Sequence, residues 1–288
     1  MAPSAVVAAP PLQPPRFGLI QAARDASSDN GPDGAPARWQ GGFTWEGESC
    51  ADAGVVAVCD TTTAMTLDED DNAGVGTFEP FVVWAGHRCS SFGASEAERE
   101  AKARRLLNVH QHRQVEAEFW TGTWAQADGN ANAYLASDAT TVLSPGDSSS
   151  PLVYGLAALE EALAGCGGRG MVHVTTYTLT LLAAAQAVRR EGGLYLTALD
   201  NIVVPGSGYD GSSPDGDIDA TGATAWAYAT GMVDVRLGPV SVDGGERSMQ
   251  RRQNVIEVRA ERTAAANFDP CCVFGINVNL CETFCDPG

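Results

Sequence analysis

Hydrophobic and polar positions along the chain predict one long helix. It begins at Ser95, where Glu98 three residues on completes a capping box, and runs to about Phe119 before Gly122 ends it. At about 1.5 Å per residue, this helix would form a spine about 35 Å long. Its predicted apolar stripe contains Ala103, Leu106, Leu107, His110 and Ala117.

Two further helices are predicted in the second half of the chain. One follows the Gly/Ser/Pro-rich linker 144–151 and ends at the glycines near Gly165. A third is predicted from Thr176 to Arg190, with Arg189 and Arg190 at its negative C-terminal end. The apolar positions of the first of these recur at the spacing of one helical face: Leu152, Leu156, Leu159 and Leu163.

Short apolar runs bounded by turn residues predict strands, and their order predicts the fold class. Residues 254–262 and 272–278 are predicted to form a long pair of alternating strands, and 207–224 a polar loop. The acidic, breaker-rich segment 67–76 indicates the tip of a long hairpin or extended loop. Strands and helices fall in separate blocks, so the fold class is α+β. The other predicted strands are 43–46, 55–58, 81–85, 171–174, 194–199, 201–204, 226–229 and 232–237.

Composition and charge restrict the possible partners. The chain has 18 basic and 36 acidic residues and a formal net charge of −18, which argues against a broad phosphate-binding surface. No apolar run approaches the roughly 18–20 residues that a membrane-spanning helix needs. Residues 1–15 are rich in Ala and Pro and lack a basic n-region, so we expect an extended arm and no signal peptide.

Eight cysteines are present, and no CxxC pair occurs among them. In a chain of this length without an export signal, we interpret them as thiols in a reducing compartment. The alternative is disulfides formed after release into an oxidising medium, first of all in the cluster 271–285. The eight are Cys50, Cys59, Cys89, Cys166, Cys271, Cys272, Cys281 and Cys285.

Two segments resemble ligand-binding motifs but depart from them. Residues 206–211 (GSGYDG) match the dinucleotide fingerprint after a strand, but no helix follows, so we interpret them as a glycine-rich turn. Asp215, Asp217 and Asp219 are spaced like the opening of a calcium loop, but Ala220 occupies the position of the required glycine. We interpret that segment as a solvated acidic loop.

The histidines do not form a metal-ligand pattern. His110 and His112 are two residues apart on a helix and so do not share a face. His87 lies near Cys89, but zinc sites usually show paired ligands at short spacing. We therefore predict no metal site and no cofactor.

Paired acids occur twice on predicted helices, at Glu116 with Glu118 and at Glu160 with Glu161. We interpret all four as exposed acids. No nucleophile elbow, HExxH motif or Walker-type loop is present in the sequence. We predict no catalytic residues and no enzymatic activity.

The C-terminal half resembles the major capsid proteins of tailed bacteriophages, the Hong Kong 97-type fold, in versions from phages of GC-rich actinobacteria. The matching stretches are residues 151–185, 192–209, 225–240 and 254–278, for example GGLYLTALDNIVVPGSGY and NVIEVRAERTAAANFDPCCVFGINV. The resemblance implies five parts in this order: an N-terminal arm (1–37), an extended hairpin loop (38–88), a peripheral domain with the spine helix (89–149), an apical domain (150–230), and a return to the peripheral domain with the C-terminal tail (231–288).

The resemblance implies a structural, self-assembling role. Subunits would form hexamers and pentamers of an icosahedral shell, which is assembled in the host cytoplasm and becomes part of the virion. The shell would enclose double-stranded DNA without sequence-specific binding. Portal, scaffold and decoration proteins are candidate partners, and no membrane is involved. Alternatives are a minor head, neck or tail protein, a bacterial nanocompartment shell of the same fold, and a cytoplasmic enzyme or binding domain. Copy number, cargo, and a bound metal or cofactor would distinguish them.

Overall fold

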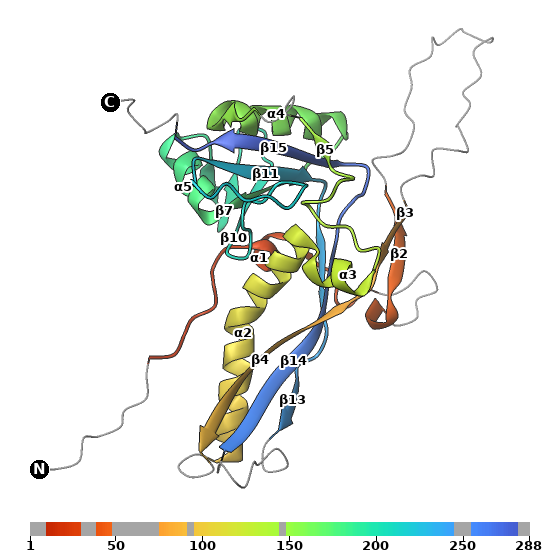
Figure 1. Ribbon diagram of the computed structural model, residues 1–288, viewed down its shortest axis with the longest axis vertical. Helices are drawn as coiled ribbons and strands as arrows, with labels where there is room; N and C mark the ends of the chain where they lie inside the picture. The colour runs from red at the N-terminus through yellow and green to blue at the C-terminus, as the bar shows by residue number, and fades with distance from the viewer. Residues whose placement is uncertain are drawn as a thin grey trace, which may run out of the picture.

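The computed structural model divides the described chain between two mixed sheets and a small hairpin, with one long helix beside the first sheet and two helices beside the second (Figure 1). This arrangement is the predicted α+β class. The described residues also form three short helices, α1 (Leu19–Ala22), η1 (Trp39–Gly41) and α3 (Thr123–Asp128). The structure describes residues 10–29, 39–47, 75–90, 95–143, 148–244 and 255–281.

The long helix α2 (Glu96–Thr121) confirms the predicted spine. Ser95 and Glu98 form the capping box in both directions, and Gly122 ends the helix at φ 58°. His110 is exposed, which corrects its place in the predicted stripe. The face of α2 that is buried lies along a long pair of strands. Its buried residues recur at every fourth position: Arg99, Ala103, Leu107, Gln111, Val115 and Phe119.

The capping box leads to a first prediction. Ser95→Ala removes the side chain that accepts the N–H of Glu98, and should lower the free energy of unfolding by about 1 kcal/mol. Ser95→Asn keeps an acceptor at the cap and serves as the control. Urea unfolding of the three proteins measures the effect, and equal midpoints for all three would contradict it.

Five described strands form the sheet beside α2. β4 and β14 pair antiparallel from Phe81 opposite Ala264 to Ser90 opposite Val255, and α2 covers one face of this ladder (Figure 1). The spatial order is β1 (Arg24–Asp25), β12 (Asp234–Leu237), β14 (Val255–Asn267) and β13 (Ser241–Gly244), with β4 (Phe81–Ser90) also pairing with β14.

Eight described strands form the second sheet, which carries α4 (Leu152–Gly165) and α5 (Thr176–Ala184). All four leucines predicted for the face of α4 are buried in one cluster with residues of β11 and β15. The order is β5 (Thr141–Val142), β15 (Val273–Asn279), β11 (Thr224–Thr230), β7 (Met171–Thr175), β10 (Ile202–Gly206), β9 (Leu194–Leu196) and β8 (Arg189–Glu191), with β6 (Ser150–Pro151) also pairing with β15.

The third predicted helix is too long. α5 ends at Ala184, Gln186 adopts a left-handed φ of 58°, and Arg189 and Arg190 lie in the edge strand β8. Pairing with β9 gives this segment backbone hydrogen bonds along one side in place of helical ones. The guanidinium of Arg189 also donates to the carbonyl oxygen of Thr197.

The predicted pairing of the last two strands is wrong. β14 pairs with β4, β12 and β13, whereas β15 lies between β11 and the short strands β5 and β6 in the other sheet. The segment from Phe268 to Cys272 connects the two sheets. Both strands alternate in hydrophobicity, and alternation does not specify the partner.

The hairpin before α2 is formed by other segments than the strands predicted on either side of the tip. β2 (Phe43–Glu46) pairs with β3 (Val75–Phe78), while the stretch predicted at 81–85 belongs to β4. The strand predicted at 55–58, and residues 67–74 of the predicted tip, lie outside the described residues. The division of the chain into five parts stays a prediction.

Among the helices that the structure describes, none has a long enough apolar stretch to cross a lipid bilayer.

Candidate functional site

Glu116, on α2, joins three segments that are far apart in the sequence. One carboxylate oxygen accepts the N–H of Leu19 at 3.1 Å. The other accepts the N–H and hydroxyl of Ser207, at 2.7 and 2.9 Å, and the N–H of Gly208 at 3.0 Å. Glu116 is 1% exposed, so its interpretation as an exposed acid is wrong. These contacts, which we call the Glu116 junction, link the N-terminal segment, α2 and the loop after β10.

The glycine-rich turn 206–211 supplies half of this junction. The pKa of Glu116 is raised above its usual value, because the effect of burial exceeds that of the hydrogen bonds with Gly208, Ser207 and Leu19, which lower it. A Cβ on Gly208 would lie 2.2 Å from the carbonyl oxygen of Arg113, so only glycine allows the loop to approach α2 this closely. The N–H groups that a nucleotide site would turn toward a phosphate therefore hold a carboxylate of the same chain.

The other paired acids differ in their surroundings. Glu118 is half-buried, and its two oxygens accept the N–H groups of Trp124 and Ala125, both at 2.9 Å, at the start of α3. Glu160 is half-buried and accepts the N–H of Leu199 at 3.3 Å. Glu161 alone of the four is exposed, as the sequence predicts.

A buried histidine lies close to the junction, and the sequence analysis did not single it out. His173 of β7 is 0% exposed; its Nδ1 lies 3.1 Å from the hydroxyl of Tyr209 and its Nε2 lies 3.0 Å from the hydroxyl of Thr230. Thr230 donates its proton to the carbonyl oxygen of Gly231. We therefore assign the proton of His173 to Nε2, with Nδ1 accepting from Tyr209.

Burial lowers the pKa of His173 to about 3. Because this value lies below the pKa of about 6.5 in an unfolded chain, the neutral ring stabilises the fold fully above pH 6.5. The contribution of His173 to the free energy of unfolding therefore falls by about 1.4 kcal/mol per pH unit as the pH falls from 6.5 toward 3.

Replacing His173 should therefore change the acid sensitivity of the protein. His173→Gln should flatten the decline of unfolding free energy between pH 6.5 and 4.5, whatever its effect at pH 7. The exposed His110→Gln serves as the control and should leave the slope as it is. Chemical denaturation across this pH range measures both slopes, and an unchanged slope in His173→Gln would contradict the assignment.

The remaining sequence candidates do not come together as a metal or cofactor site. Asp215 and Asp217 are exposed, as the interpretation of a solvated acidic loop requires, whereas Asp219 is half-buried. Asp219 accepts hydrogen bonds from Thr221 and Thr224, which lower its pKa. His112 contacts Gln21 at 3.2 Å, whereas His87 lies on β4. Within the described parts of the chain, no three His, Cys, Asp or Glu residues are grouped to hold a metal ion.

The interpretation of the cysteines as thiols is wrong for three of them. Cys166 and Cys272 form a disulfide, and Cys271 is also disulfide-bonded. Two of the three lie in the cluster 271–285, where the sequence indicated disulfides as the alternative. Cys89 is a thiol, as predicted, and Cys50, Cys59 and Cys285 lie outside the described residues.

The face of the β4–β14 ladder that points away from α2 carries exposed apolar side chains. Phe81, Val83 and Ala85 are buried toward α2, whereas Val82 and Trp84 point the other way and are 56% and 60% exposed. We call this surface of the ladder the outer ladder face. An exposed tryptophan beside an exposed valine on regular structure is typical of a protein–protein contact.

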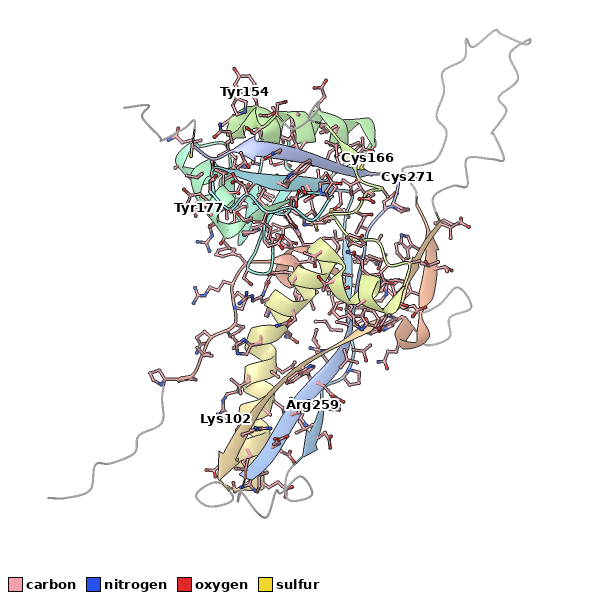
Figure 2. All side chains as sticks on the ribbon, in the orientation of Figure 1. Lys102, Tyr154, Cys166, Tyr177, Arg259 and Cys271 are labelled. Atoms are coloured by element: carbon pink, nitrogen blue, oxygen red, sulfur yellow. A yellow bond between two sulfur atoms is a disulfide. The ribbon has the colours of Figure 1, made fainter. Side chains whose placement is uncertain are left out.

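Charged residues continue the outer ladder face beyond Trp84. Arg88 pairs with Glu257 across the two strands at 2.5 Å, and Arg259 pairs with Glu261 along β14 at 2.9 Å. Figure 2 shows Arg259 on the lower part of this ladder. An apolar centre with a charged surround is the usual composition of an interface between proteins.

The two sheets, the helix along the ladder and the hairpin before it define the class of fold: the chain has the fold of tailed-phage capsid proteins. The capsid of the empty GTA particle matches with a TM-score of 0.54 and 12% identity, over 97% of this chain and 95% of that chain. The capsid of Ralstonia phage GP4 matches with a TM-score of 0.51 and 11% identity, over 100% and 96%.

An encapsulin also has a similar fold, over a smaller share of both chains. The holo-SrpI encapsulin complex from Synechococcus elongatus matches with a TM-score of 0.51 and 7% identity, over 72% of this chain and 77% of that chain. No family model and no curated protein matches the sequence. At these identities the similarity establishes the fold alone.

Proposed function

We propose that this chain is the major capsid protein of a tailed bacteriophage, a structural protein that assembles into an icosahedral shell around double-stranded DNA. The observation that carries the proposal is the match of nearly the whole chain to two phage-type capsids, each also covered over at least 95%. Strands and helices from the first described segment to the last take part in this fold.

The surface and the interior of the subunit fit this role. The outer ladder face offers apolar and charged side chains to a neighbouring subunit, and repeated contacts of this kind close into hexamers and pentamers. The Glu116 junction holds α2 against the loop after β10, and His173 joins the same loop, through Tyr209, to the second sheet. A subunit would therefore enter the shell with its two sheets in a defined arrangement. No step of this mechanism needs a cofactor or catalysis.

Charge supports enclosure of DNA without binding to it. A formal net charge of −18 repels phosphates, so the shell wall would release DNA freely. The measurement is the binding of double-stranded DNA to purified particles over a range of salt concentrations. We expect negligible binding, and steeply salt-dependent binding would contradict this part of the proposal.

The encapsulin similarity is the reason to consider a bacterial nanocompartment as the second candidate. The two functions differ in cargo, so particles from the native source decide between them. A phage shell contains nuclease-protected DNA and hundreds of copies of this chain, whereas a nanocompartment contains protein and no DNA. Rings of six or twelve copies would instead indicate a neck or tail component.

A further inference from the structure

The Cys166–Cys272 disulfide lies where a helix and a strand of the second sheet meet. Cys166 follows the last residue of α4, and Cys272 precedes the first residue of β15. The two cysteines are 106 residues apart in the sequence. Figure 2 shows Cys166 beside the end of α4, with Cys271 close to it. The bond therefore closes a long loop of chain at one end of the α4–β15 contact.

Apolar packing also holds these two elements together. The buried leucines of α4 lie in one apolar cluster with Ile276 and Val278 of β15. Gly155 of α4 approaches so closely that a Cβ there would lie 2.4 Å from Val278. Cys272 is itself part of this cluster, and a thiol packs there as a small apolar group. Both cysteines are thus held at a Cα separation of 6.0 Å, within the range for a disulfide.

The two sulfur-bearing residues differ in their access to solvent. Both line an open groove of about 620 Å³ together with Gly167 and Arg169. Cys166 is half-buried, whereas Cys272 is 1% exposed. A small molecule in the groove therefore reaches Cys166 first, and Cys272 reacts from the protein side.

We propose that this disulfide is a redox clasp, open as two thiols in a reducing compartment and closed in an oxidising one. The thiolate of Cys166 attacks a small-molecule disulfide, forms a mixed disulfide and releases one thiol. The thiolate of Cys272 then attacks the sulfur of Cys166, forms the Cys166–Cys272 bond and releases the second thiol. The small-molecule disulfide is reduced to two thiols, and the two protein thiols are oxidised. In an assembled shell, the bond would close once the particle reaches an oxidising medium, and this step rests on the proposed function. The opening and closing of the bond in the subunit does not depend on that function.

The test uses purified full-length protein carrying Cys271→Ala, so that the neighbouring disulfide does not contribute. The protein is equilibrated in graded mixtures of reduced and oxidised glutathione and alkylated, and the Cys166–Cys272 pair is quantified by mass spectrometry. We expect reversible opening with the near-ultraviolet circular dichroism retained. The thermal midpoint of the open form should be lower by about 10 °C, because the cross-link no longer restricts a long loop in the unfolded chain.

The matched control adds Cys166→Ala and Cys272→Ala to the same background. Its midpoint should equal that of the open form and should not respond to the glutathione ratio. Three results would each overturn the clasp: loss of tertiary structure on reduction, a bond that resists reductant in the native protein, or equal midpoints for the open and closed forms. None of these depends on particle formation, so failure here and failure of the proposed function are distinguishable.

Discussion

Glu116→Ala should lower the free energy of unfolding by about 4 kcal/mol, because it leaves buried donors without an acceptor. Three backbone N–H groups and one hydroxyl converge on this carboxylate. Water has little access to a side chain that is 1% exposed. The loss should appear in urea unfolding and as faster hydrogen exchange at Leu19, Ser207 and Gly208.

Two variants separate this effect from a general effect of altering α2. Gln114→Ala changes an exposed residue of the same helix and should stay within about 0.5 kcal/mol of the original protein. Glu116→Gln keeps one acceptor oxygen but turns an amide NH₂ toward the other donors. Its loss of unfolding free energy should therefore lie between those of Gln114→Ala and Glu116→Ala. A Glu116→Ala protein as stable as Gln114→Ala would show that the junction does not hold the segments together.

Trp84→Glu should abolish assembly while leaving the subunit folded. A tryptophan that is 60% exposed contributes little to the stability of the isolated subunit. At the centre of an interface, the same side chain typically accounts for 2 kcal/mol or more, roughly a 30-fold change in each contact. The introduced carboxylate would also lie opposite Glu261 on β14, in a chain that is already acidic.

The comparison for this variant is Trp84→Phe, which keeps an apolar ring at the same place. It should still form particles, at a higher protein concentration than the original chain. Light scattering measures assembly, and circular dichroism measures the fold of the subunits. Normal particles from Trp84→Glu would show that the outer ladder face is not an assembly contact.

Local signals in the sequence were sufficient for the elements whose stability is local. The capping box at Ser95, the leucine face of α4 and the strand at residues 171–174 are all present in the structure. Each depends on contacts within a few residues or on one period of hydrophobicity. The α+β class was also predictable, because it follows from the strand and helix patterns along the chain.

Pairing over long distances was not predictable from the sequence. β14 and β15 both alternate, and only the positions of β4 and β11 determine that they lie in different sheets. Glu116 was misread for the same reason, since its partners are 91 to 97 residues away. The closely spaced Gly206 and Gly208 could have indicated these contacts, because a glycine-rich turn whose N–H groups can bind a phosphate can also bind a carboxylate.

His173 and the Cys166–Cys272 bond show the same limit. A histidine within an apolar strand is compatible with a buried, hydrogen-bonded ring, but the sequence does not indicate that Tyr209 and Thr230 are its partners. Cysteines that are 106 residues apart pair only because α4 packs against β15.

The central claim is that this chain assembles into a closed shell, and electron microscopy of the purified recombinant protein, with its size-exclusion profile, tests it most directly. The account predicts closed particles or flat hexameric sheets at high protein concentration. Small discrete rings, or a protein that stays monomeric at every concentration, would contradict it.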